Sequence, residues 1–191
     1  MKRQRLRRHR TSLGSDKSLA RAAARARRAG ADPALGARLA GHVLAKCAPP
    51  PGAVVAGFWP LPGEIDVRPL LLVLVGRGHA VLLPDTPGRG QPLAFRRWRP
   101  GVAMVAGRFG TLRPEGAVAV PDLLLVPLLA FDSQCRRLGY GAGYYDRTIA
   151  ASPGMQTIGC AFAVQQMEAV PVSAHDVPLD VVATEVGVFR P

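Results

Sequence analysis

The sequence predicts an α/β fold with three layers, in which a mainly parallel sheet is covered by helices on both faces. Short apolar runs typical of buried strands alternate with helical segments from residue 53 onward. A Gly-rich turn at 139–143 separates one such run from the next helical segment. The 48% apolar and 20% charged residues are typical of a globular chain, and 191 residues suffice for one domain with a sizeable core.

The positive charge is concentrated at the N-terminus. Residues 1–28 hold 11 of the 25 Lys and Arg residues and one of the 13 Asp and Glu residues, which leaves a net charge of only +2 on the rest. We expect 1–15 to be a disordered basic leader and 16–191 to form a single domain. A mitochondrial presequence and a start codon assigned too early are the alternatives. Because the body is nearly neutral, nucleic-acid binding is not expected as the main role.

Helix and strand signals follow in order along the domain. Ser15 or Asp16 is a suitable N-cap for a helix over 17–29, which Gly30 ends. A second helix over 33–47 has Pro at its first position. Further helices are expected at 67–77, 144–151 and 165–169, and strands at 53–59, 79–84, 93–98, 123–127, 157–162, 181–184 and 187–189.

The cysteines and the lengths of the apolar runs indicate in which cellular compartment the protein is expected. Cys47, Cys135 and Cys160 are odd in number and far apart, so they support neither a disulfide framework nor a zinc site. The apolar stretches at 70–75 and 123–131 are far shorter than the roughly 20 residues of a membrane helix. We therefore expect a cytoplasmic protein without a membrane partner. A monomer is also expected, although no sequence feature fixes the oligomeric state.

The segment 122–147 carries the clearest chemistry. The glycines of 139–143 allow backbone N–H groups to turn inward, and the helix that follows adds a positive dipole end. Together they suit a phosphate group. Arg136 and Arg137 could add guanidinium forks, and Asp146 could hold Mg²⁺ beside a nucleotide. These residues indicate a phosphate or nucleotide site; a merely structural turn is the alternative.

Residues 137–147, RLGYGAGYYDR, resemble the signature RLGYGGGYYDR of the 5-formyltetrahydrofolate cyclo-ligase family. Ala142 replaces a glycine common in that motif, and Arg113 occupies a position that is usually acidic. The resemblance extends over about 16–190. Its other blocks, in the family's order, are 17–21, 60–66, 92–98, 109–116, 121–132 and 170–185.

The resemblance implies an enzyme that uses ATP and Mg²⁺ to convert 5-formyltetrahydrofolate to 5,10-methenyltetrahydrofolate, ADP and phosphate. It implies that the ATP-binding residues are Lys17, Arg21, Arg137, Leu138, Gly139, Tyr140, Gly141, Ala142, Gly143, Tyr144 and Tyr145. The implied folate-binding residues are Trp59, Glu64, Trp98, Tyr140, Gly141, Ala142, Gly143 and Tyr144. The implied metal ligands are Asp146 and Asp176, and the implied catalytic groups are Lys17, Arg21, Arg137 and Tyr144.

Each assignment has a plainer alternative. Lys17 and Arg21 could lie on a solvated helix face, and Glu64 could be a carboxylate at a helix start. Trp98 could fill the core, and Asp176 could belong to a simple turn. Two other functions are a family-like nucleotide- or ligand-binding protein that lacks the activity, and a nucleic-acid-binding protein that acts through its basic leader.

Overall fold

The central strand of the protein is β6 (Leu123–Pro127), an apolar run that is buried over its first four residues. The computed structural model describes the backbone of residues 2–191 and the side chains of 14 and 16–191. The other strands of its sheet are β1 (Val54–Ala56), β2 (Ala80–Asp85), β3 (Ala94–Trp98), β9 (Gln156–Cys160), β10 (Val181–Ala183) and β11 (Val188–Phe189). The helices are α1 (Lys2–Arg28), η1 (Pro33–Leu35), α2 (Gly36–Lys46), α3 (Arg68–Gly76), η2 (Arg108–Gly110), α4 (Tyr144–Ala150) and η3 (Ala163–Gln165).

The seven-stranded sheet has the order β11-β10-β9-β6-β1-β2-β3. Its inner strands β10, β9, β6, β1 and β2 run parallel to one another. The two edge strands, β3 and β11, pair antiparallel with their neighbours. The expected mainly parallel sheet is therefore confirmed.

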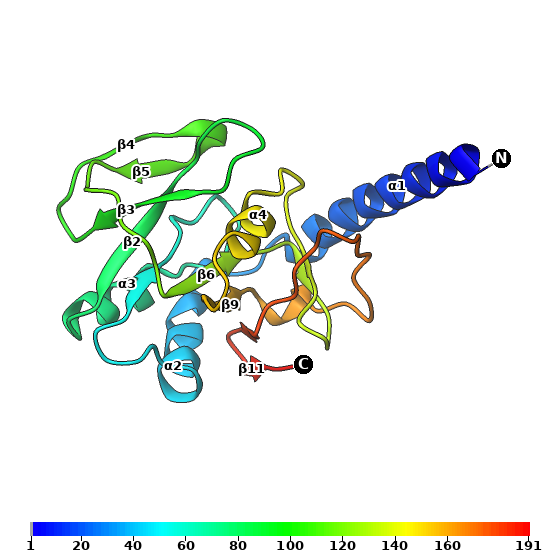
Figure 1. The fold of residues 1–191 in the computed structure, drawn as a ribbon. Helices are drawn as coiled ribbons and strands as arrows, with labels where there is room; N and C mark the ends of the chain where they lie inside the picture. Colours follow the sequence, from blue (N-terminus) through cyan, green and yellow to red (C-terminus); the bar gives the residue numbers. More distant parts are fainter. Residues whose placement is uncertain (1) are drawn as a thin grey trace.

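Helices cover both faces of this sheet (Figure 1). On one face, Leu39 of α2 and Leu71 of α3 pack with alternate strand residues such as Val55. On the other face, Tyr144 of α4 packs with residues of opposite parity such as Ala56. Because successive side chains of a strand point to opposite faces, the apolar side chains of one strand pack against helices on both sides of the sheet.

The N-terminal helix is longer than the sequence analysis expects. A helix was expected over 17–29, and α1 extends from Lys2 to Arg28, away from the body of the protein (Figure 1). Residues 2–28 contain no proline and only one glycine, and Arg, Leu and Ala favour a helix. The disorder expected for 1–15 stays a prediction.

Two short hairpins were not expected. One pairs β4 (Met104–Ala106) with β5 (Leu112–Pro114), and the other pairs β7 (Ala130–Phe131) with β8 (Arg137–Leu138). The second hairpin lies between the strand 123–127 and the Gly-rich turn at 139–143. Strands of two or three residues carry too little periodicity to be recognised in a sequence.

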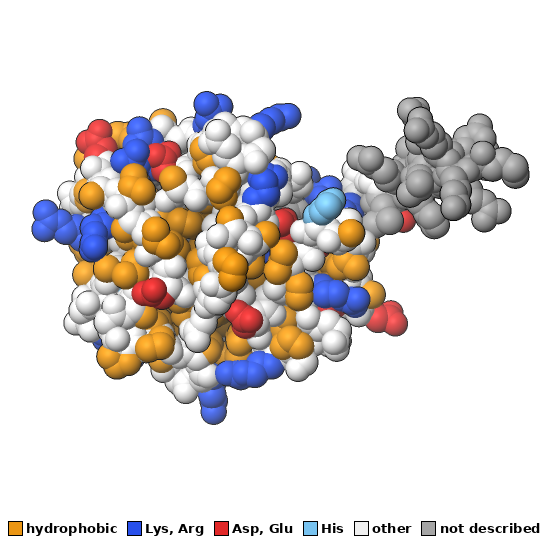
Figure 2. Space-filling model, in the orientation of Figure 1, with side chains coloured by type: hydrophobic (Ala, Val, Ile, Leu, Met, Phe, Trp, Pro, Cys, Tyr) orange, Lys and Arg blue, Asp and Glu red, His pale blue; other side chains and the backbone are white. Residues whose placement is uncertain are grey.

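The described surface of the body has no single basic tract on the face seen in Figure 2. Its Lys and Arg side chains lie mostly near the outline of this face, with Asp and Glu side chains among them. This agrees with the low net charge of the chain beyond residue 28. None of the described helices has the length and apolar character needed to cross a membrane.

The start of α2 provides a test of the packing between α2 and the segment before α3. A Cβ on Gly36 would lie 1.7 Å from the backbone oxygen of Asp66, whereas a Cβ on Gly41 of the same helix would meet nothing within 4 Å. We expect Gly36→Ala to lower the free energy of unfolding by about 1–3 kcal/mol through overpacking. Gly41→Ala should raise it by about 0.5–1 kcal/mol, because alanine is the better helix former.

Urea unfolding of the two variants measures both changes. Equal stability of the two variants would contradict the close approach of α2 to Asp66.

Candidate functional site

A cavity of about 840 Å³ lies at the carboxyl ends of the parallel strands. Phe58 follows β1, Thr86 follows β2 and Pro127 ends β6, and all three line the cavity. Ligands of open α/β sheets bind in such crevices. The residues predicted for the site line this cavity, except Trp98 and Arg136. Arg136 instead pairs with Asp132, Nε to Oδ2 at 2.8 Å, so the expectation that it binds phosphate beside Arg137 is wrong.

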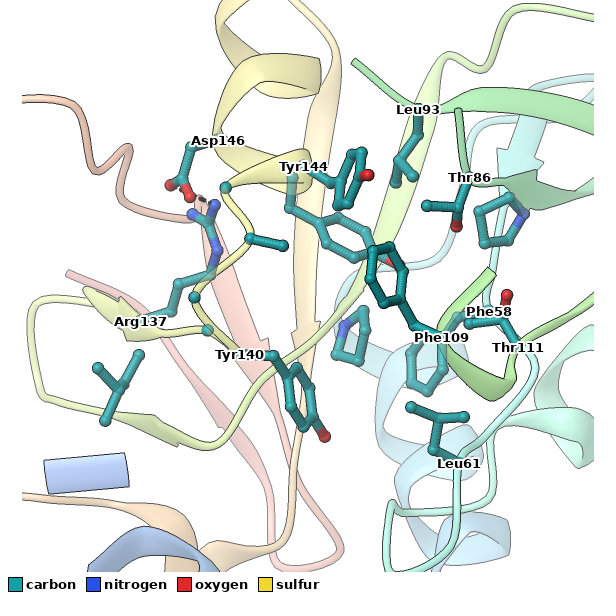
Figure 3. A pocket seen from close by; sticks show the side chains of 18 of the residues that line it. Phe58, Leu61, Thr86, Leu93, Phe109, Thr111, Arg137, Tyr140, Tyr144 and Asp146 are labelled. Carbon is teal, nitrogen blue, oxygen red and sulfur yellow. Dashed lines mark hydrogen bonds and ion pairs between the residues drawn. The ribbon is translucent and has the colours of Figure 1, made fainter. Parts of the chain in front are cut away.

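The loop 139–143 forms one wall of the cavity, between β8 and α4 (Figure 3). Gly141 and Gly143 have φ values of 104° and 70°, a region that favours glycine. Ala142 is not among the described residues with positive φ, which explains why alanine is accepted at that position. Arg21 Nε donates to the Gly139 carbonyl at 2.9 Å and thereby attaches α1 to the loop.

Arg137 and Asp146 form a partly buried ion pair beside this loop (Figure 3). Arg137 Nη2 lies 2.6 Å from Asp146 Oδ1, and the Arg137 side chain is only 4% exposed. The same guanidinium donates to the Val177 carbonyl, and the Val177 N–H lies 3.4 Å from Asp146 Oδ1. Burial lowers the pKa of Arg137, and the nearby carboxylates of Asp146 and Asp176 oppose this shift.

Lys17 and Asp176 form a second ion pair across the cavity wall. Lys17 Nζ also donates to Ser173 Oγ at 3.0 Å, and the Ser173 N–H donates to Asp176 Oδ2 at 2.7 Å. Burial raises the pKa of Asp176, but the hydrogen bonds from Lys17 and Ser173 outweigh it, and the net shift is downward. Asp176 thus belongs to a turn and to the cavity wall at once, and Lys17 does not lie on a freely solvated face.

Glu64 lies in the turn between β1 and α3 and is 6% exposed. The Tyr140 hydroxyl donates to Glu64 Oε1, and the Leu61 N–H donates to Oε2 at 2.8 Å. Burial raises the pKa of Glu64, although these hydrogen bonds and the charge of Arg28 act in the opposite direction. Because α3 begins only at Arg68, Glu64 is not a carboxylate at a helix start.

Two carboxylates of the cavity wall, Asp146 and Asp176, could bind a divalent cation. Both act on the Arg137 guanidinium, so they lie on the same side of the cavity. Among the described residues, no group of three or more His, Cys, Asp or Glu could hold a metal ion. Two carboxylates still fit Mg²⁺, which commonly binds through one or two carboxylates together with phosphate oxygens and water.

Trp98 does not line the cavity, so the expectation that it contacts the substrate is wrong. It is 8% exposed and packs in the core around α2 and α3. Trp59 lies between this core and the cavity, with its ring edge-on to Trp98 at a centroid distance of 6.0 Å. Trp98 therefore fills the core, as the plainer alternative had it, and from there it supports the position of Trp59.

Sequence reasoning missed the aromatic wall opposite the Gly-rich loop. Phe109, on η2 between β4 and β5, lines the cavity, is 59% exposed, and lies 6.1 Å from the Tyr144 ring (Figure 3). Its φ of 58° is unusual for a residue other than glycine. Phe58 and Thr86 were also missed, and their positions directly after apolar strands were the available signal.

Comparison with known proteins identifies relatives over most of the chain. The model of the 5-formyltetrahydrofolate cyclo-ligase family matches residues 2–185. The 5-formyltetrahydrofolate cyclo-ligase of Escherichia coli K12 is 35% identical over 145 residues, which cover 71% of this chain and 80% of that protein. The enzyme of the same name from Mycolicibacterium smegmatis is 35% identical over 144 residues, 70% of this chain and 74% of that protein.

Solved structures with the same fold include two 5,10-methenyltetrahydrofolate synthetases. The protein from Aquifex aeolicus matches with a TM-score of 0.78 and 30% identity, over 91% of this chain and 92% of that chain. The protein from Mycoplasma pneumoniae matches with a TM-score of 0.70 and 20% identity, over 89% of this chain and 99% of that chain. The second likeness concerns the fold alone.

The raised pKa of Glu64 predicts how a substitution there affects stability at different pH. A raised pKa means that the folded protein binds the proton more tightly than the unfolded chain. The stabilisation is complete below the ordinary value of 4.5 and is lost as pH rises through the folded pKa. Glutamine does not titrate, so Glu64→Gln should gain stability relative to the wild type between about pH 4 and about pH 7.5.

Urea unfolding at both pH values measures this difference, with Glu168→Gln, at an exposed carboxyl, as the matched control. A stability difference that stays the same at both pH values would contradict the raised pKa.

Proposed function

Since this chain belongs to the 5-formyltetrahydrofolate cyclo-ligase family, we propose that it is the ligase that cyclises 5-formyltetrahydrofolate to 5,10-methenyltetrahydrofolate at the expense of ATP. The family model covers nearly the whole chain, and its relatives carry this activity in their names. The observation that carries the proposal is that one cavity unites cations, carboxylates and aromatic side chains from distant segments.

The nucleotide end of the cavity, in this proposal, is the side with Lys17, Arg21 and Arg137. All three side chains line the cavity, and Arg21 donates to the Gly139 carbonyl of the loop 139–143, so they suit the phosphates of ATP. Leu138 to Tyr145 supply the wall on which the nucleotide rests. Arg137 is already ordered by Asp146, so little conformational freedom is lost when it binds a phosphoryl oxygen.

The folate end is the side with Glu64, Trp59 and Tyr140. A pterin ring presents adjacent N–H donors, which match the two oxygens of a buried carboxylate. Glu64 keeps acceptor capacity for them, because each of its oxygens accepts only one hydrogen bond from the protein. Trp59 and the 140–144 segment supply flat and apolar surface beside it.

The chemistry then needs positioning and charge neutralisation more than a protein nucleophile. The formyl oxygen attacks the γ-phosphorus of ATP, and ADP leaves. N10 of the folate attacks the activated formyl carbon, phosphate leaves with the former formyl oxygen, and N10 loses its proton. Lys17, Arg21 and Arg137 spread the charge of the transferred phosphoryl group, while Glu64 orients the ring that carries the formyl group. Tyr144, whose hydroxyl donates to the Pro87 carbonyl at 3.1 Å, holds the wall between the two ligands.

Mg²⁺ belongs to the proposal as the partner of the nucleotide. Asp146 and Asp176 would hold it, and when bound it would neutralise phosphate charge. We also propose that the enzyme acts as a monomer in the cytoplasm, because one chain supplies the whole cavity wall and all three cysteines are free.

The function is tested by following 5,10-methenyltetrahydrofolate spectrophotometrically as it forms from 5-formyltetrahydrofolate. Product should form only when ATP and Mg²⁺ are both present. A purified protein that binds both substrates and forms no product would be a binding protein of this family, and would refute the proposal.

Asp146→Asn tests the metal role. Asparagine can still accept a hydrogen bond from Arg137 but is a weaker ligand for Mg²⁺, so turnover should fall at least about tenfold. Higher Mg²⁺ should recover part of the loss. Glu168→Gln, at an exposed site, is the control. Wild-type turnover in Asp146→Asn would exclude Asp146 as a ligand.

Glu64→Gln tests the folate role. An amide presents a donor where the pterin needs an acceptor, so the KM for the folate should rise about tenfold or more while the KM for ATP changes little. Steady-state kinetics with each substrate varied in turn measures the two values. An equal rise in both KM values would contradict the assignment.

A further inference from the structure

One face of α1 follows the cavity beyond the two predicted residues Lys17 and Arg21. Ala24 and Arg28 continue the same face, at the spacing of successive helical turns. Ala24 is 2% exposed and packs with Leu129 and neighbouring apolar residues, so this part of the helix is fixed against the body. Arg28 therefore lies on an anchored helix at the folate end of the cavity.

Arg28 is joined to Glu64 through Tyr140. Arg28 Nη1 donates to the Tyr140 hydroxyl oxygen at 2.9 Å, and the Tyr140 hydroxyl donates in turn to Glu64 Oε1. The guanidinium also lies along the turn that carries Glu64, since a Cβ on Gly63 would be 3.6 Å from Arg28 Nη2. Figure 3 shows Tyr140 extending from its loop toward Leu61 in that turn.

The direction of these hydrogen bonds is fixed by chemistry. A guanidinium can only donate, so the single hydroxyl proton of Tyr140 is available for Glu64. An ionised Glu64 can only accept, which completes the chain from a cation through a phenol to a carboxylate. Such charge-assisted hydrogen bonds are stronger than neutral ones and hold their groups in one geometry.

We propose that Arg28 is a positioning residue for folate binding, which acts through Tyr140 to hold Glu64 as an oriented carboxylate. This inference rests on the proposed function, because it assigns Glu64 to the pterin ring. The side-chain hydrogen bond of Arg28 goes to Tyr140 in the loop 139–143, which lines the cavity, so a role at the site accounts for this contact better than a purely structural role.

The surroundings of Glu64 explain why it needs this cation. Tyr140 and Tyr145 are the titratable groups that face it from the loop and from α4, and Arg28 is the cation that acts on it from α1. Burial raises the pKa of Glu64, and the positive charge of Arg28 counteracts that rise. Without the charge, a larger fraction of Glu64 would be protonated and unable to accept two N–H donors.

The experiment measures binding of 5-formyltetrahydrofolate by calorimetry, without ATP, across a pH range. Arg28→Gln should weaken binding about tenfold, as expected for the loss of a hydrogen bond to a charged group, and should shift the acidic limb of the binding profile to higher pH. Arg28→Lys, which keeps the charge, should leave that limb close to the wild-type position. Arg27→Gln, at an exposed neighbour on α1, is the matched control.

Tyr140→Phe removes the middle of the chain and should weaken binding to a similar extent. In the double variant Arg28→Gln/Tyr140→Phe, measured at a pH above the acidic limb of every variant, the loss should be smaller than the sum of the two single losses, because both changes break one connection. If Arg28→Gln does not fold, the folate affinities of Arg28→Lys and Tyr140→Phe still test whether the connection from Arg28 through Tyr140 to Glu64 supports binding.

The inference is overturned if Arg28→Gln binds like Arg27→Gln, if the acidic limb does not move, or if the two losses simply add. A wild-type protein that binds the folate and forms no product with ATP would refute the proposed reaction alone, and the ratios of Kd would still decide the role of Arg28. A wild-type protein that does not bind the folate would refute both.

Discussion

The cavity depends on the pairing of its partly buried charges. A cation or carboxylate withdrawn from water is costly unless it has a partner, so each such group in the wall requires another at a defined distance. One pair here joins distant parts of the chain, and the other spans the Gly-rich loop. Lys17 of α1 joins Asp176 near the C-terminus, and Arg137 joins Asp146 across the Gly-rich loop. These pairs fix the N-terminal helix, the loop and the 173–176 turn around one space.

The sheet supplies the frame for this arrangement. Because β1, β2 and β6 are parallel neighbours, the segments that follow them leave the sheet at the same edge. The apolar side chains of β6 are buried on both faces, which keeps this edge rigid while the polar residues beyond it remain accessible. A rigid frame with chemistry on the adjoining loops is the general division of labour in α/β proteins.

The charge distribution has a local meaning as well. The basic N-terminal segment dominates the net charge of the chain, yet its described inner face is directed at the cavity through Lys17 and Arg21, and Arg28 continues the same face. By composition alone, this basic segment resembles a nucleic-acid-binding tail. Part of it nevertheless belongs to the wall of a small-molecule site. The site also costs stability at Glu64. Burial raises the pKa of this carboxyl, which means that its ionised form is less stable in the folded protein than in water.

The sequence by itself determined the mainly parallel sheet, the helices expected at 33–47, 67–77 and 144–151, and most of the residues that line the cavity among those proposed for the site. The apolar run at 123–127, the helix stop at Gly30 and the RLGYGAGYYDR segment are local signals, readable because propensity and turn chemistry act over a few residues. Only the tertiary structure decided the rest. Trp98 packs in the core, the β4–β5 hairpin brings Phe109 to the cavity, and Arg28 reaches Glu64 through Tyr140. These outcomes depend on contacts between residues far apart in the chain, and no local pattern in a single sequence encodes which side chains will meet.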